Sequence, residues 1–145
     1  MKAKVYLILI SFVLALPAMA QKADFEKLSP SVTATIMEVA MGNQGHPVNI
    51  KAEWTKNGWN FNIDLKLAYT EKTMVGFLAA MIGAVYTGTR WTRWRSNRIY
   101  ISTGNLKFAW ITTKACRTIG AKLERKEIDG TGALKLLNKE MHMLI

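Results

Sequence analysis

The dipeptide Asn57-Gly58 is the feature that most constrains how this 145-residue chain can fold. Both positions tolerate positive φ, so the pair is typical of a two-residue β-hairpin turn. Folding the chain about this turn places apolar side chains on one face and polar side chains on the other. The apolar face would hold the pairs Trp54–Phe61, Ala52–Ile63 and Ile50–Leu65. We therefore predict a hairpin over residues 50–65, with Trp54 and Phe61 opposed in the core.

A second hairpin is predicted around Gly104-Asn105, between strands over residues 98–103 and 106–112. In this register Ile101 faces Phe108, and Ile99 faces Trp110. Each hairpin then has one apolar face that needs cover. Two such hairpins can join as one antiparallel four-stranded sheet with helices packed on one face.

Four helices are expected around these hairpins. The first begins at Pro30 after the N-cap Ser29 and ends near Gly42, and the second follows the N-cap Thr70. Two more are expected after Thr113 and Thr131. The predicted order is α-ββ-α-ββ-α-α, an α+β fold. Since no repeat or linker interrupts residues 21–145, we predict one domain there.

Residues 1–20 have the three parts of a secretory signal. Lys2 and Lys4 precede the apolar run of residues 5–16, and Ala18-Met19-Ala20 supplies the small residues of a cleavage site. The run of 12 residues is too short to cross a hydrocarbon core of about 30 Å as a helix. We therefore predict a cleavable signal peptide and an exported protein, periplasmic or secreted, of a bacterial cell envelope.

The basic residues are concentrated in one part of the chain. Residues 90–126 hold ten basic residues and one acidic residue, whereas residues 21–89 hold six of each. Arginine offers forked donors to phosphate or carboxylate, and tryptophan offers a flat amphipathic ring. The candidate binding residues are Arg90, Trp91, Arg93, Trp94, Arg95 and Arg98. The alternative is structural, with the tryptophans in the core and the arginines at a solvated edge.

The expected partner of these residues is an anionic envelope component. Lipid headgroups, lipopolysaccharide, acidic glycans and an acidic protein all fit this description. Nucleic acid is not expected outside the cytoplasm, except in a setting such as DNA uptake. The leading hypothesis is therefore a small exported binding module that uses residues 90–98.

Residues 73–89 form an uncharged run of seventeen residues that allows two interpretations. Gly76, Ala80 and Ala84 recur every four residues, as in helices that pack closely within membranes. The first interpretation is a core helix lying on the sheet. The alternative is a membrane-embedded subunit of an envelope complex. We favour the core helix, because a span would separate the hairpins and leave each with an uncovered apolar face.

Cys116 is the one candidate nucleophile of the exported chain. Its place near a helix start, beside Lys114 and Arg117, would favour a thiolate and hence a thiol-dependent enzyme. Catalysis also needs an oriented base, and His46 and His142 lie near opposite ends of the chain. A small buried residue is the alternative. Since no phosphate loop, metal-ligand cluster or serine elbow is present, we predict no enzyme, metal or cofactor.

Overall fold

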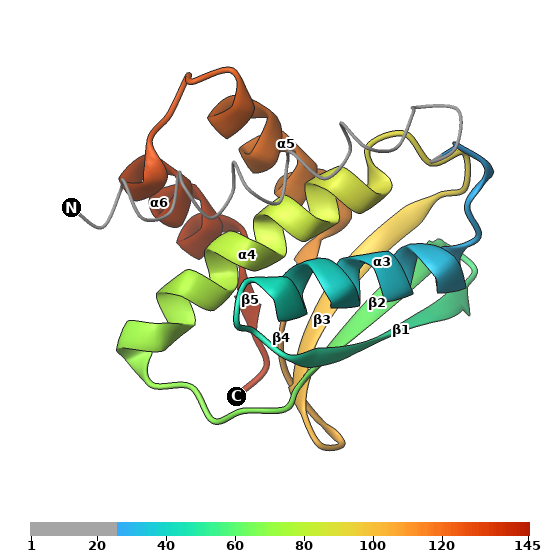
Figure 1. The fold of residues 1–145 in the computed structure, drawn as a ribbon, viewed down its shortest axis with the longest axis horizontal. Helices are drawn as coiled ribbons and strands as arrows, with labels where there is room; N and C mark the ends of the chain where they lie inside the picture. Colours follow the sequence, from blue (N-terminus) through green and yellow to red (C-terminus); the bar gives the residue numbers. More distant parts are fainter. Residues whose placement is uncertain (1–25) are drawn as a thin grey trace.

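The computed structural model describes residues 26–145, so the predicted signal peptide lies outside the described residues. The described part is an α+β fold, which confirms the predicted class. Its sheet has five strands in the order β1-β2-β3-β4-β5 and is mixed, so the predicted four-stranded antiparallel sheet is wrong. Helices α3, α4 and α5 lie side by side across one face of this sheet (Figure 1).

Capping residues set the helix starts. Ser29 accepts a hydrogen bond from the Val32 amide before helix α3, and Thr70 accepts one from Thr73 before helix α4. Helices α5 and α6 are capped by Thr112 and Asp129, slightly earlier than the sequence suggested. The helices are α3 (Pro30–Asn43), α4 (Glu71–Thr89), α5 (Thr113–Glu124) and α6 (Gly130–Glu140). The strands are β1 (Val48–Thr55), β2 (Gly58–Leu65), β3 (Ser96–Thr103), β4 (Leu106–Thr112) and β5 (His142–Met143).

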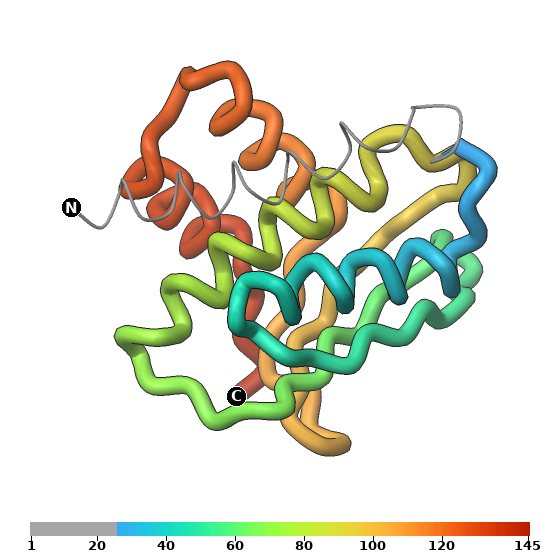
Figure 2. Tube along the Cα trace, viewed as in Figure 1, coloured from blue at the N-terminus to red at the C-terminus, as the bar shows by residue number. Residues whose placement is uncertain are grey.

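The two hairpins join through a parallel pair. Strand β2 runs parallel to β3, because the 19 residues of α4 carry the chain back along the sheet before β3 begins. This crossover is visible in the Cα trace (Figure 2). The antiparallel prediction failed here since the alternation within each hairpin carries no information on how the hairpins join.

The first hairpin has the predicted faces in a different register. Its pairs are Trp54–Trp59, Ala52–Phe61 and Ile50–Ile63. The turn is formed by Lys56 and Asn57, and positive φ falls on Gly58, at 119°. The predicted pairing is therefore wrong by two residues, a shift that preserves both faces because side chains alternate with period two. Trp54 is also not in the core as predicted, since it is 65% exposed near the hairpin end.

The second hairpin has the predicted turn, with Thr103 paired to Leu106. A register shift between Ile101 and Ser102 then changes every further pair, so the predicted Ile101–Phe108 and Ile99–Trp110 pairs are wrong. The observed pairs are Ile101–Ala109, Tyr100–Trp110 and Ile99–Ile111. The shift places Ile99 and Ile101 opposite the buried residues Ile111 and Ala109 in the core. It also moves Trp110 to the other face of the sheet.

Helix α4 is the centre of the core. Its residues 79–89 are all buried, between α3 on one side and α5 on the other. A Cβ on Gly88 would lie 2.9 Å from Met37 Cγ, and a Cβ on Gly120 would lie 2.7 Å from Tyr86 Cβ. Small residues thus allow close packing of three helices here. Within residues 26–145, no helix is long and apolar enough to span a bilayer.

Candidate functional site

Residues 90–98 connect α4 to β3 as a turn and the start of a strand, and residues 91–95 are not helical. The six predicted binding residues therefore do not share one surface. They lie in three places: between α4 and α5, at the end of the first hairpin, and on the uncovered face of the sheet.

Arg90 and Trp91 belong to a structural network between α4 and α5. The Arg90 Nη1 atom lies 3.2 Å from Glu124 Oε1, and the side chain is only 14% exposed. Its guanidinium stacks 4.0 Å from the centroid of the Trp91 ring and 4.9 Å from that of Tyr86. Tyr86 donates its hydroxyl proton to the same Glu124 carboxylate. Arg90 thus serves helix packing, and most of its donor surface is not open to a partner.

Trp94 is an anchor of the fold. Its indole Nε1 donates a hydrogen bond of 2.8 Å to the Leu28 carbonyl oxygen. Its ring packs on Phe61, with 5.7 Å between ring centroids, and Phe61 is fully buried. The structural interpretation of this tryptophan therefore fits the geometry best.

Arg98 lies apart from the other arginines, on the uncovered face of the sheet. Its guanidinium carbon is 3.7 Å from the centroid of the Trp110 ring, and its Nη1 donates to the Tyr100 hydroxyl at 3.2 Å. Both contacts hold the side chain flat against strands β3 and β4.

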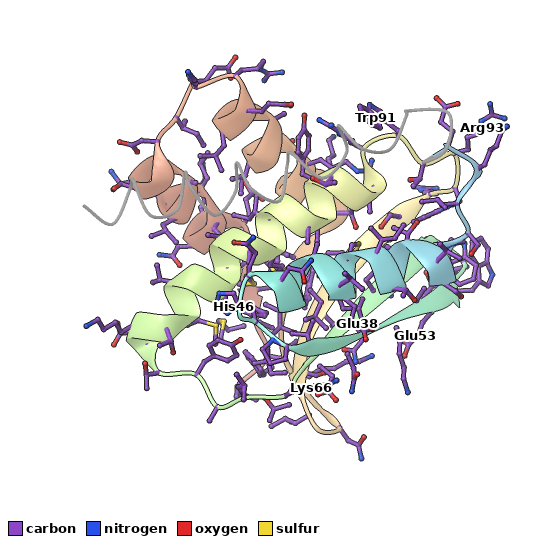
Figure 3. The ribbon with its side chains drawn as sticks, viewed as in Figure 1. Glu38, His46, Glu53, Lys66, Trp91 and Arg93 are labelled. Carbon is purple, nitrogen blue, oxygen red and sulfur yellow. The ribbon has the colours of Figure 1, made fainter. Side chains whose placement is uncertain are left out.

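Arg93 and Arg95 are the exposed members of the segment. The Arg93 side chain is 77% exposed and forms an ion pair of 3.3 Å with Glu26. Figure 3 shows it pointing away from the body of the molecule. The Arg95 side chain is exposed, while its carbonyl oxygen accepts a 2.7 Å hydrogen bond from the Trp59 amide. This bond ties the segment to the first hairpin.

That bond brings Arg95, with Arg93 two residues before it, to the end of the first hairpin, where the sequence did not place them. Trp54 packs edge-on against Trp59, with 5.5 Å between ring centroids, and Lys56 is exposed in the adjacent turn. We call this group the hairpin-end patch. It consists of Trp54, Lys56, Trp59, Arg93 and Arg95. It combines three cationic side chains with one large exposed aromatic ring.

Sequence reasoning missed Trp54 and Lys56 because it assigned the tryptophan to the core. The apolar alternation of β1 continues to Trp54, but this residue belongs to the last pair but one before the hairpin turn. A signal was available in its position, since a residue close to a hairpin turn has fewer neighbours than one in the middle of a strand.

Cys116 is fully buried in α5. Burial raises the pKa of its thiol to about 12, and the opposing effect of the Arg117 charge is smaller. The thiol is therefore protonated at neutral pH, and the helix-start argument for a thiolate does not apply. Within the described residues, no three His, Cys, Asp or Glu side chains gather where they could hold a metal ion.

This burial predicts slow alkylation. At pH 8 a thiol with a pKa near 12 is about 0.01% thiolate, so native Cys116 should react with iodoacetamide roughly a thousandfold more slowly than in the urea-unfolded chain. Mass spectrometry of timed samples measures both rates. Comparable rates in the native and unfolded chains would restore the thiol-enzyme hypothesis.

Comparison of the chain with models of protein families, with curated proteins and with solved structures finds no match.

Proposed function

We propose that this protein is an exported, non-enzymatic binding module of the bacterial cell envelope, and that its hairpin-end patch engages an anionic membrane surface. The observation that carries the proposal is the exposure of Trp54, 65%, beside basic side chains. An indole combines apolar area with one polar N–H, which suits the boundary between lipid headgroups and acyl chains. Arg93 and Arg95 add forked donors that match phosphate oxygens.

The net charge supports the same partner. Residues 21–145 contain 18 basic and 10 acidic residues, a net charge of +8. A protein of this charge is attracted to an anionic surface before any specific contact forms. Near such a surface each lysine or arginine contributes about 1 kcal/mol, and salt screens this contribution.

Neither alternative function gains support from the geometry. A membrane-embedded subunit would need residues 73–89 exposed to lipid, whereas most of α4 is buried among α3 and α5. A thiol-dependent enzyme would need an accessible thiolate, whereas Cys116 is buried and its thiol has a pKa of about 12.

The proposal is tested by vesicle co-sedimentation of the chain over residues 21–145. Replacing Arg93 and Arg95 together by Ser should remove about 2 kcal/mol of binding to phosphatidylglycerol vesicles, roughly 30-fold in affinity. Trp54→Ala should weaken binding at all salt concentrations, because insertion of the ring is less screened than ion pairing. Binding of the unchanged protein should fall as salt rises.

The matched control removes two charges elsewhere. Lys135 and Lys139 are exposed on α6, which lies at the other end of the molecule from the hairpin end (Figure 1). Replacing both by Ser leaves the same net charge as the double arginine variant. Equal losses in the two double variants would show that net charge, and not the patch, determines binding. Absence of binding at low salt would refute the proposed function itself.

A further inference from the structure

Helix α3 has an outer face without charge. Glu38 is the one charged residue among the 14 of this helix, and its carboxylate accepts a 3.0 Å hydrogen bond from the Ile50 amide of β1. A surface helix of a water-soluble protein usually carries charged residues on its solvent side. The solvent side of α3 instead presents Val32, 45% exposed, and Val39, 57% exposed. The helix therefore leaves apolar area in water with no charged side chain of its own beside it.

Val32, Thr35 and Val39 form one continuous stripe, because residues three and four apart on a helix are neighbours. All three are exposed. The Thr35 hydroxyl donates to the Ser31 carbonyl oxygen at 3.2 Å, so the polar group of the stripe has a partner within the helix. Val32 and Val39 are about 10 Å apart along the helix axis. A stripe of this kind can enter an apolar phase without taking a charge or an unpaired side-chain donor with it.

The stripe begins beside the hairpin-end patch. Glu26, just before α3, pairs with Arg93 at 3.3 Å, and the Leu28 carbonyl oxygen accepts the hydrogen bond of the Trp94 indole. Trp54 lies on the apolar face of the first hairpin, and α3 packs on β1 across that face. Figure 1 shows α3 starting at the end of the molecule where β1 turns into β2. The patch and the stripe are therefore adjacent on the surface.

We propose that the stripe and the hairpin-end patch form one membrane-binding surface. Val32, Thr35 and Val39 enter the boundary between headgroups and acyl chains, while Arg93 and Arg95 contact lipid phosphates. This inference rests on the proposed function and extends it, because it makes the lipid bilayer itself the partner. A free anion or an acidic glycan would satisfy the arginines but would offer no apolar phase to the valines.

Vesicle co-sedimentation at low and at moderate salt tests the inference. The exposed fractions of Val32 and Val39 add up to about one whole valine. Replacing both by Ser should therefore weaken binding of residues 21–145 to phosphatidylglycerol vesicles about tenfold. The factor should be the same at both salt concentrations, since apolar burial is not screened. The melting temperature should stay unchanged, because valine and serine have similar helix propensities and both sites are exposed.

Leu106→Ser is the matched control. Leu106 is 57% exposed at the β3–β4 turn, which lies at the opposite end of the strands from the hairpin end because β2 and β3 are parallel. This variant should bind like the parent. If the double valine variant also binds like the parent while the Arg93 and Arg95 variant loses binding, the inference is overturned and the proposed function stands. If the parent itself does not bind, both are overturned.

A fluorescent label reports the position of the stripe directly. Val39→Cys can be labelled with nitrobenzoxadiazole, because native Cys116 is buried and should react far more slowly. Its emission should shift to the blue when phosphatidylglycerol vesicles are added, whereas the same label on Asn138→Cys, exposed on α6, should not respond. No shift for vesicle-bound protein would place the stripe outside the bilayer. A blue shift that needs only a higher protein concentration would show that a second copy covers the stripe. Either result would overturn the assignment.

Discussion

Replacing Gly58 by alanine should lower the free energy of unfolding by about 2–5 kcal/mol. Gly58 has φ of 119°, a backbone conformation that is strained for any residue with a Cβ. A Cβ there would also lie 2.7 Å from the Arg95 carbonyl oxygen, the acceptor of the Trp59 amide. The added Cβ and the Arg95 carbonyl oxygen are both fixed directly to the backbone and cannot rotate away from each other. Strands β2 and β3 must therefore separate at this contact. Urea unfolding followed by circular dichroism measures the loss.

Gly104→Ala is the matched control for this prediction. Gly104 also has positive φ, 60°, but an added Cβ would meet nothing within 4 Å. Gly104→Ala should therefore lower the free energy of unfolding by about 1 kcal/mol, through backbone strain alone. If the two glycine variants lose the same stability, the contact between the added Cβ and Arg95 is relieved with no loss of free energy. Residues 93–96 are then not held rigidly against the hairpin.

Trp94→Ala should cost about 3 kcal/mol of stability, near the lower end of the range for large aromatic truncations. The change removes the packing on Phe61 and the hydrogen bond to Leu28, which together hold residues 91–95 against the body of the protein. Trp54→Ala is the comparison, since it removes the same side chain from an exposed position. It should cost about 1 kcal/mol, mainly the contact with Trp59.

The opposite pattern would contradict this assignment. If Trp94→Ala leaves urea unfolding unchanged but weakens vesicle binding, its ring belongs to the binding surface and the anchor role is wrong. If Trp54→Ala is the more destabilising of the two, the hairpin end is packed rather than exposed, and the patch loses its aromatic member.

Several features of the local structure could be predicted from the sequence. The capping hydroxyls of Ser29 and Thr70 marked helix starts, because a cap acts over three residues of the same chain. The turn at Gly104-Asn105 and the alternation of β1 and β2 are equally local. They predicted strands, two hairpins and the two faces of the first hairpin. The separation of basic from neutral segments was also visible, although it could not show which arginines reach the surface.

Only the tertiary structure determined the features that depend on residues distant in the chain, namely strand register, strand direction and exposure. An alternation of period two is unchanged by a shift of two residues, so Trp54 could pair with Phe61 or Trp59 until packing selected one. Helix α4 decided that β2 and β3 run parallel. The partial burial of Trp94 depends on its contacts with Phe61 and Leu28, which are distant in the chain. The surface proposed to bind a membrane thus arises from a juxtaposition that only the fold creates, with Arg95 beside Trp59 at the hairpin end.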